Sequence, residues 1–298
     1  MRPYVDGYFL LSLVQSERFV KVVLDNCTGT SYPAINANDL AEIEVAAPSD
    51  ESEARKIGTI FRSIDNLITL HQRKFEKLTN VKKSMLEKMF PQNGSSYPEI
   101  RFKGFTDPWE QRKLGDIGET YTGLSGKTKA DFGHGQARFV TYMNVFSNPI
   151  SNPEMTEPIE IDPKQNEVEV GDVLFTTSSE TPEEVGMSSV LLEKRGKTYL
   201  NSFCFGFRPS EKIDSYYLAY MLRSESAREK IILLAQGISR YNISKNKVME
   251  IAVSLPSLDE QKLIGQCFRQ LDHLITLHQR ELEKLQNIKK SMLEKMFV

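Results

Sequence analysis

Three short motifs in this 298-residue sequence resemble pieces of catalytic sites, and all three are incomplete. The stretch TGLSGKT (122–128) ends like a phosphate-binding loop. Such a loop requires a glycine five positions before Gly126, because its backbone wraps around the phosphates, and Tyr121 stands there. We therefore interpret this stretch as a chance match.

Motifs of two other enzyme classes also fail. They are the pairs Asn148-Pro149 and Asn152-Pro153 and the triplet Asp162-Pro163-Lys164. The pairs do not continue with the proline and aromatic residue of amino-methyltransferases, and no cofactor-binding glycine motif precedes them. The triplet lacks the strand that accompanies it in nucleases. We expect no catalytic residues, no cofactor and no metal.

Polar residues in two further stretches have the chemistry that reads nucleic acids. The stretch GISRYNISK (237–245) offers an arginine that can fork onto guanine or phosphate, a tyrosine that can stack, and an asparagine that can pair with adenine. The stretch RFVTYMNVF (138–146) places an arginine, a tyrosine and an asparagine at alternate positions of what could be a strand. The candidate DNA-binding residues are Lys127, Lys129, Arg138, Tyr142, Asn144, Ser178, Ser179, Arg240, Tyr241, Asn242 and Lys245. Ordinary loop polarity is the alternative for each.

Net charge opposes this interpretation unless the charges are unevenly placed. The formal net charge is −2, whereas most DNA-binding proteins carry a basic face. Residues 154–184 hold ten acids against Lys164 alone. We expect this stretch to face away from phosphate, on a side that is free to meet a protein partner.

The elements that must position these residues include a long internal repeat. Residues 65–90 recur almost unchanged as residues 272–297, and weaker similarity extends back to Asp6 and Asp214. Relative to the second copy, about 117 residues of the first copy are missing. In the first copy Tyr32 stands where Arg240 stands in the second, which weakens the case for 237–245 as a base reader.

Apolar residues in both copies step by alternating fours and threes, which is the pattern of a coiled-coil seam. The seam residues are Ile57, Phe61, Ile64, Ile68, His71, Phe75 and Leu78 in one helix and Ile264, Phe268, Leu271, Ile275, His278, Leu282 and Leu285 in the other. Beyond them we expect the apolar stripe to move one residue back, to Val81, Met85 and Met89 and to Ile288, Met292 and Met296. Each helix, of some 34 residues, would be about 50 Å long.

His71 and His278 hold the same seam position near the middle of their helices. A polar seam residue that fixes register is the favoured interpretation, over a metal ligand or a pH switch. If the two helices pair, the imidazoles should lie close together.

Between the helices, short β-rich runs and helical runs predict a domain of the α+β class. We therefore expect a globular α+β domain with two long helices that pair as an antiparallel coiled coil. The expected boundaries are a domain remnant at 1–47, a first helix at 48–92, a complete domain at 93–256 and a second helix at 257–298.

The order of these segments resembles the specificity subunit of type I restriction-modification systems. The resemblance rests on YPEIRFKGF, PWEQRKLGDI and GDVLFTTSSETPEEVG, followed by GISRYNISKNKVMEIAVSLPSLDEQKLIGQCFRQLD and a long helix. It implies two target-recognition domains, each reading half of a split double-stranded DNA target, with paired helices between them. It also implies methyltransferase subunits and a restriction-translocase subunit as partners, and no chemistry by the chain itself. Because only one recognition domain is complete, the chain resembles an N-terminally truncated member.

Two other functions remain open. A scaffold that assembles partners through its helices would show no salt-dependent duplex binding, and a catalytic methyltransferase or nuclease would show turnover. Under the favoured function, the chain binds a half-site weakly or pairs with a second copy of itself. We expect exposed apolar surface around Phe9, Leu10 and Leu13.

The sequence also bears on where the chain works. No apolar run is long enough for a membrane span, and the three cysteines form no CxxC pair. We expect a cytoplasmic location.

Overall fold

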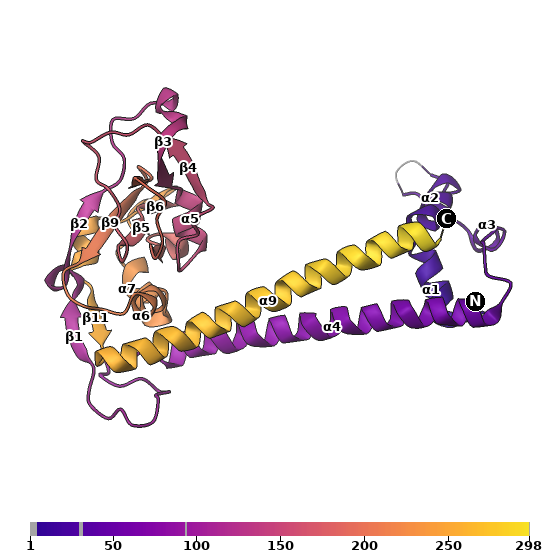
Figure 1. Cartoon of the computed structure of the whole chain (residues 1–298), viewed down its shortest axis with the longest axis horizontal. Helices are drawn as coiled ribbons and strands as arrows, with labels where there is room; N and C mark the ends of the chain where they lie inside the picture. Colours follow the sequence, from indigo (N-terminus) through magenta and orange to yellow (C-terminus); the bar gives the residue numbers. More distant parts are fainter. Residues whose placement is uncertain (1–4, 30–31, 93, 298) are drawn as a thin grey trace. The chain divides into compact units, whose positions relative to one another are not determined.

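The computed structural model describes residues 5–29, 32–92 and 94–297. The chain forms two compact units. Unit 1 comprises Met1–Thr79 and His273–Val298, and unit 2 comprises Asn80–Asp272. The two longest helices, α4 (Glu51–Lys88) and α9 (Leu258–Met296), each contribute to both units (Figure 1).

The centre of unit 2 is an antiparallel sheet in the order β2-β9-β5-β7. Its strands are β2 (Gly118–Thr122), β9 (Cys204–Pro209), β5 (Val173–Thr176) and β7 (Ser188–Val190). Every residue of β5 is buried, because this strand is covered on both faces. Phe175 stacks on Phe205 with ring centroids 5.0 Å apart, and both belong to the main apolar core.

A second sheet of unit 2 has the order β4-β3-β8. It consists of β4 (Thr156–Ile159), β3 (Phe132–Val140) and β8 (Thr198–Leu200), with β3 and β8 parallel. Two small pairs complete the strands: β1 (Glu110–Lys113) with β11 (Ala252–Leu255), and β6 (Ser178–Ser179) with β10 (Tyr241–Asn242).

The short helices of unit 2 are α5 (Tyr142–Ser147), α6 (Ser215–Met221), α7 (Glu225–Ile232) and α8 (Lys245–Met249), and its 3-10 turns are η1 (Leu114–Asp116), η2 (Lys129–Asp131) and η3 (Pro182–Glu184). Asp214 caps α6 and Ser224 caps α7, each by accepting a backbone N–H of the first turn. The prediction that Tyr142 and Asn144 lie on a strand is wrong. Thr141 accepts the N–H of Asn144 and starts helix α5 at that point.

Unit 1 repeats the C-terminal part of this pattern. It contains α1 (Gly7–Val14), α2 (Glu17–Asp25) and α3 (Ala37–Ala41), capped by Asp6, Ser16 and Asn36. The backbone bridge between Thr28 and Ala34 matches the bridge between Gln236 and Asn242 in unit 2.

A glycine marks where the short capped helix meets the long helix in each unit. A Cβ on Gly58 would lie 2.1 Å from Oδ1 of Asp6, and a Cβ on Gly265 would lie 2.6 Å from Oδ1 of Asp214. Both contacts are closer than a side chain permits. The repeated Ile-Gly pair in the sequence therefore reflects the same helix contact in both units.

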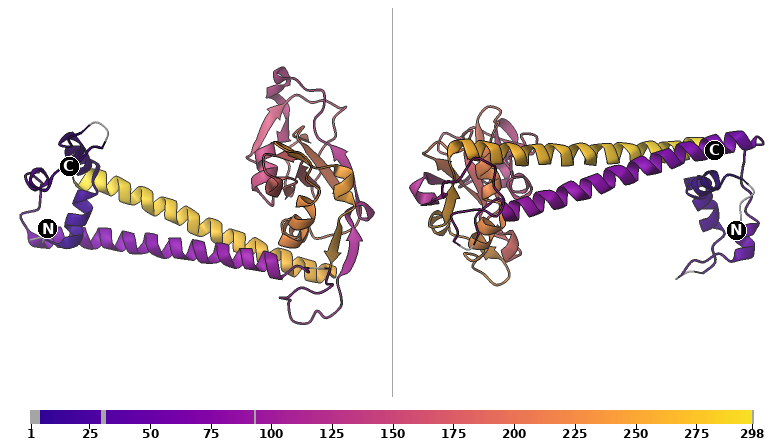
Figure 2. Two further views of the ribbon diagram at one scale, coloured as in Figure 1. Left: turned by 180° about the vertical axis from the view of Figure 1, so that it is seen from behind. Right: turned by 90° about the horizontal axis from the view of Figure 1, so that it is seen from below.

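The two long helices are antiparallel in each unit (Figures 1 and 2). In unit 1, Lys289 pairs with Asp65 at 2.7 Å, and Nδ1 of His71 lies 3.1 Å from Nδ1 of His278. In unit 2, Lys82 pairs with Asp272, and Phe90 stacks on Phe268. The predicted α+β class, antiparallel pairing and histidine contact are confirmed.

The predicted shift of the apolar stripe is wrong at three positions. Val81, Ile288 and Met296 have exposed fractions of 38%, 40% and 37%. Lys82 and Lys289 keep the seam positions instead, because each reaches an aspartate of the opposite helix and remains only about a fifth exposed. A long aliphatic stem with a paired amine fills the seam as an apolar side chain would.

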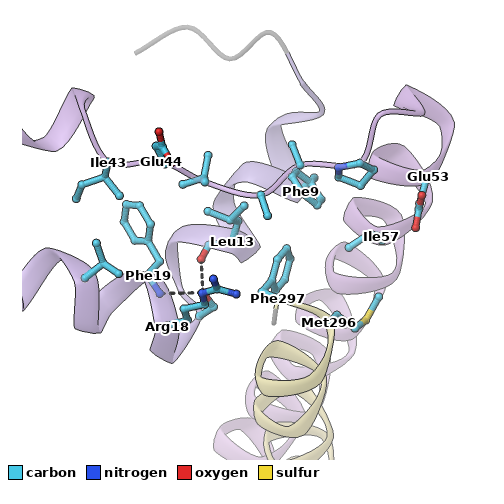
Figure 3. Close-up of a pocket in the computed structure, with 16 residues that line it drawn as sticks. Phe9, Leu13, Arg18, Phe19, Ile43, Glu44, Glu53, Ile57, Met296 and Phe297 are labelled. Atoms are coloured by element: carbon cyan, nitrogen blue, oxygen red, sulfur yellow. Dashed lines mark hydrogen bonds between the residues drawn. The ribbon is translucent and has the colours of Figure 1, made fainter.

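The exposed apolar surface expected around Phe9, Leu10 and Leu13 is present as an open pocket, but the side chains of Phe9 and Leu13 are themselves buried. Their exposed fractions are 2% and 5%, and they form a small core with Ala54. Both still line an open pocket, which Figure 3 shows. Within the described ranges, no helix is long and apolar enough to cross a membrane.

Candidate nucleic-acid interface

Five of the predicted DNA-binding residues meet at one place in unit 2. The pairing of β6 with β10 sets Tyr241 opposite Ser179 and Asn242 opposite Ser178. The hydroxyl of Tyr142, from the start of α5, donates a 2.6 Å hydrogen bond to the carbonyl oxygen of Ser178. Three segments that are far apart in the sequence therefore form one polar cluster, which we call the β6–β10 cluster.

A tight loop, 237–241, projects from this cluster. The backbones of Gln236 and Asn242 exchange hydrogen bonds of 2.9 and 2.8 Å, which close the loop. Gly237 has φ of 143°, and a Cβ there would lie 2.0 Å from the carbonyl oxygen of Arg240. Ile238 is 95% exposed and Arg240 is exposed. The glycine predicted as a turn residue is therefore required by the loop.

Phe203 belongs to the same surface and was not predicted. Its side chain is 56% exposed, and its carbonyl oxygen accepts hydrogen bonds from the backbone N–H (2.9 Å) and the hydroxyl (2.8 Å) of Thr177, next to Ser178. In the sequence Phe203, Phe205 and Phe207 alternate, a pattern that suggests one buried face. Only Phe205 and Phe207 are buried, because β9 begins at Cys204. An exposed aromatic ring of this kind can contact the methyl group of a thymine.

The cations nearest in sequence to the loop have no acidic partner. Within the part of the chain that the structure describes, Arg240, Lys245 and Lys247 form no ion pair. Lys245 is half-buried at the start of α8, and Lys247 is exposed. Their charges remain available to an anionic ligand such as a phosphate backbone.

Acidic residues also reach this cluster. The hydroxyl of Ser179 donates to the carboxylate of Glu184 at 3.2 Å. The expected separation of the acidic stretch 154–184 from the candidate interface is therefore wrong at its C-terminal end. Elsewhere in the stretch, basic side chains neutralise several of the acids: Lys194 pairs with Glu167 and Glu169, and Arg195 pairs with Glu154.

Asn144 lies apart from the cluster and is fully buried. Its amide nitrogen donates to the carbonyl oxygens of Asn152 (2.7 Å) and Met155 (3.0 Å), and its amide oxygen accepts the N–H of Asn152 (2.9 Å). Arg138 is similarly engaged, because its guanidinium donates to the hydroxyl and carbonyl oxygens of Thr156. These polar groups hold the loop 148–156 in place.

Lys127 and Lys129 form a third group around η2. The Lys127 amine lies 2.8 Å from Oδ2 of Asp162, and this hydrogen bond lowers the pKa of Asp162 and raises the pKa of Lys127. Lys129 is exposed. The structure thus distributes the eleven candidates over separate places: the β6–β10 cluster, the loop 237–241 with Arg240, α8, the loop held by Asn144 and the turn η2.

Two half-buried arginines, Arg223 and Arg228, brace the elements that carry the cluster. Arg223 donates to the carbonyl oxygens of Ser188, Val145 and Phe146, and this anchors the end of α5. Arg228 donates to the carbonyl oxygens of Gly186 and Val185. Burial lowers the pKa of both guanidinium groups to about 10, because the charged form loses hydration.

Comparisons with known proteins agree on one family. The family described as "Type I restriction modification DNA specificity domain" matches residues 106–287. The type I restriction enzyme MjaVIII specificity subunit of Methanocaldococcus jannaschii is 24% identical over 307 residues, covering 97% of this chain and 68% of that protein.

Two solved structures share the fold. The HsdS subunit from Thermoanaerobacter tengcongensis aligns with a TM-score of 0.58 at 18% identity, over 98% of this chain and 70% of that chain. The type I restriction-modification S subunit from M. genitalium aligns with a TM-score of 0.54 at 16% identity, over 99% and 73%. The family match extends over more than half of the sequence, and we conclude that this chain belongs to the specificity subunits of type I restriction-modification systems.

Proposed function

We propose that this chain binds double-stranded DNA through the β6–β10 cluster and the loop 237–241, and that this surface reads one half of a bipartite target. The observation that carries the proposal is the convergence of exposed Phe203, Arg240 and Asn242 on one surface, next to cations without acidic partners. Phe203 supplies an apolar face for a thymine methyl group, and Arg240 and Asn242 supply the donors that pair with guanine, adenine or phosphate.

The proposal leaves the chemistry to other subunits. In it the chain acts as the DNA-recognising subunit, and methyltransferase and restriction subunits assemble with it. The helices α4 and α9 are the candidate assembly surface, because their outward faces carry exposed apolar residues such as Leu67, Leu70, Leu274 and Leu277. The alternative of a scaffold without DNA affinity predicts that the same subunits assemble and that the complex ignores duplex DNA.

The experiment is fluorescence anisotropy of labelled duplexes from a randomised pool, titrated with the chain alone and with its methyltransferase subunits. We expect binding that weakens with salt, and we expect Arg240→Ala and Phe203→Ala each to reduce affinity about tenfold. Lys113→Gln is the matched control, because Lys113 is an exposed cation of the same unit that already pairs with Glu250. Equal loss in the control would refute the assignment of the surface.

Sequencing of methylated sites in cells that carry the chain and its methyltransferase tests the second part. A split target with a fixed spacer is expected. A second copy of the chain in the complex predicts a palindromic split target, and an unmodified genome would count against the whole proposal.

A further inference from the structure

The apolar pocket of unit 1 has a counterpart in unit 2 that is filled. The unit 1 pocket lies between α1, α2, residues 43–48 and the ends of the long helices at Ile57 and Phe297, and it has a volume of about 310 Å³ (Figure 3). The repeat relates it to a site in unit 2 between α6, α7, β11 and Phe90. The hollow there has a volume of only about 10 Å³.

The segment that fills the unit 2 site is residues 96–114, which we call the clasp segment. Its strand β1 pairs antiparallel with β11, with Arg112 opposite Val253. The N–H of Leu114 donates to the carbonyl oxygen of Ile251 at 3.0 Å. The clasp segment is itself closed by a 2.9 Å hydrogen bond from the N–H of Trp109 to the carbonyl oxygen of Ser96.

Two side chains of the clasp segment make specific contacts. The Trp109 ring lies 6.4 Å from the ring of Phe90 and 6.1 Å from the ring of Tyr217. Arg101 donates to both carboxylate oxygens of Glu260, at 2.7 and 2.8 Å. These contacts bury Glu260 to an exposed fraction of 1%.

Unit 1 contains counterparts of the rings, the carboxylate and the backbone that the clasp segment contacts in unit 2. Phe9 and Phe297 replace Tyr217 and Phe90, and their rings pack 5.5 Å apart, as the rings of Tyr217 and Phe90 do at 5.8 Å. Glu53 stands in place of Glu260, and it is exposed. Ile43 to Ala47 stand in place of Ile251 to Leu255, and within the described ranges their backbones have no hydrogen-bonded partner.

We propose that the unit 1 pocket binds a clasp segment from a different polypeptide. This segment has an extended strand that pairs with residues 44–47, an aromatic side chain before the strand that packs on Phe9 and Phe297, and an arginine eight residues earlier that pairs with Glu53. These features of the bound segment follow from unit 1, whose backbone, aromatic rings and carboxylate correspond to those that hold the clasp segment in unit 2.

Residues 96–114 of this chain are not the occupant, because they are already paired within unit 2. Arg101 and Trp109 are seated in unit 2, and their withdrawal would break the Arg101–Glu260 ion pair and remove the Trp109 ring from its contacts with Phe90 and Tyr217. The binding site is formed by unit 1 alone and does not depend on the DNA-binding proposal.

The test uses the full chain and a fluorescein-labelled peptide with the sequence of residues 96–114, followed by anisotropy. We expect saturable binding, and we expect the Glu53→Gln chain and the peptide with Arg101→Ala each to weaken it about tenfold. Glu51→Gln is the matched control, since Glu51 is an exposed carboxylate on the same helical turn and pairs with Arg55 of its own helix. Hydrogen exchange should slow at the amides of residues 44–47 when the peptide binds.

A charge exchange separates a specific contact from a general effect on folding. The Glu53→Arg chain should lose the original peptide and bind the peptide with Arg101→Glu. Absence of saturable binding, or equal binding by the Glu53→Gln and Glu51→Gln chains, would overturn the proposal. A dimer of the wild-type chain that Glu53→Gln dissociates, without any binding of peptide, would overturn it in favour of a second copy.

Discussion

Removal of Arg101 gives the most direct test of how the clasp segment stabilises unit 2. Its guanidinium binds Glu260 through two hydrogen bonds and donates a third, of 2.7 Å, to the carbonyl oxygen of Asp107. The hydrogen bonds to Glu260 raise the pKa of Arg101. The Glu260 side chain is 1% exposed and the Arg101 side chain 15%. The Arg101→Met variant keeps the aliphatic stem and leaves a buried carboxylate without its cation.

The size of the effect follows from that burial. Breaking a buried ion pair by removing one partner costs about 3–5 kcal/mol of unfolding free energy. With a urea dependence of about 3 kcal/mol per molar, the unfolding midpoint of unit 2 should fall by about 1–2 M. The double variant Arg101→Met/Glu260→Met should recover most of this loss, because no charge remains buried.

The chain carries its own probe for this measurement. Trp109 is the single tryptophan of the sequence, it is 2% exposed, and it belongs to the clasp segment. Urea unfolding followed by tryptophan fluorescence therefore reports on unit 2. Glu53→Gln is the matched control, since the same position in unit 1 is exposed and should leave this transition unchanged. A midpoint for Arg101→Met equal to that of the control would refute the reasoning.

Three further changes have definite expected outcomes. Ile275→Asp should lower the thermal midpoint of unit 1, because it places a charge in the seam between the helices. The loss should be smaller than for a fully buried position, since Ile275 is only half-buried, and Leu274→Asp, at a position that is 40% exposed, should leave the midpoint unchanged. Desolvation and then the charges of His71 and Lys74 lower the pKa of His278. Neutral His278 therefore contributes stability above the ordinary histidine pKa of about 6.5, and this contribution is lost as the pH falls below that value. Circular dichroism melts from pH 7.5 to 5 should show a falling thermal midpoint, and the double variant His71→Leu/His278→Leu should remove this fall. Gly237→Ala should reduce DNA affinity in the anisotropy assay without changing the Trp109 transition, because a Cβ there collides with the loop and not with the core.

The sequence predicts the helical part of this fold well because one periodic pattern controls it. Seam residues at alternating spacings of four and three must face the opposite helix, and the repeat fixes which copy meets which. The error at Val81 and Ile288 has a physical cause: the pattern assigns apolar residues to the seam, but Lys82 and Lys289 bury their stems there once Asp272 and Asp65 pair with their amines.

The candidate interface was only partly predictable. The glycine, tyrosine and asparagine of loop 237–242 carry local signals, and Gly237 meets a local requirement of the backbone. Asn144 and Phe203 carry no local signal in the sequence that predicts their place in the structure. Asn144 is buried because the loop 148–156 brings carbonyl groups to its amide, and the path of that loop is not visible in the residues around Asn144. Phe203 is exposed because strand β9 begins one residue later, at Cys204.

The ion pairs of unit 2 predict how strongly DNA binding depends on salt. Ion pairs within unit 2 neutralise many of its basic residues, including Lys127, Lys194 and Arg195. Next to the β6–β10 cluster, Arg240, Lys245 and Lys247 are the cations offered to phosphate, and each neutralised phosphate contributes about −0.9 to the slope of log affinity against log salt. The chain alone should therefore show a slope of about −3, and substitution of Arg240 by alanine should bring it to about −2. A much steeper slope, or one that Arg240→Ala leaves unchanged, would mean that DNA is bound by another surface of the chain.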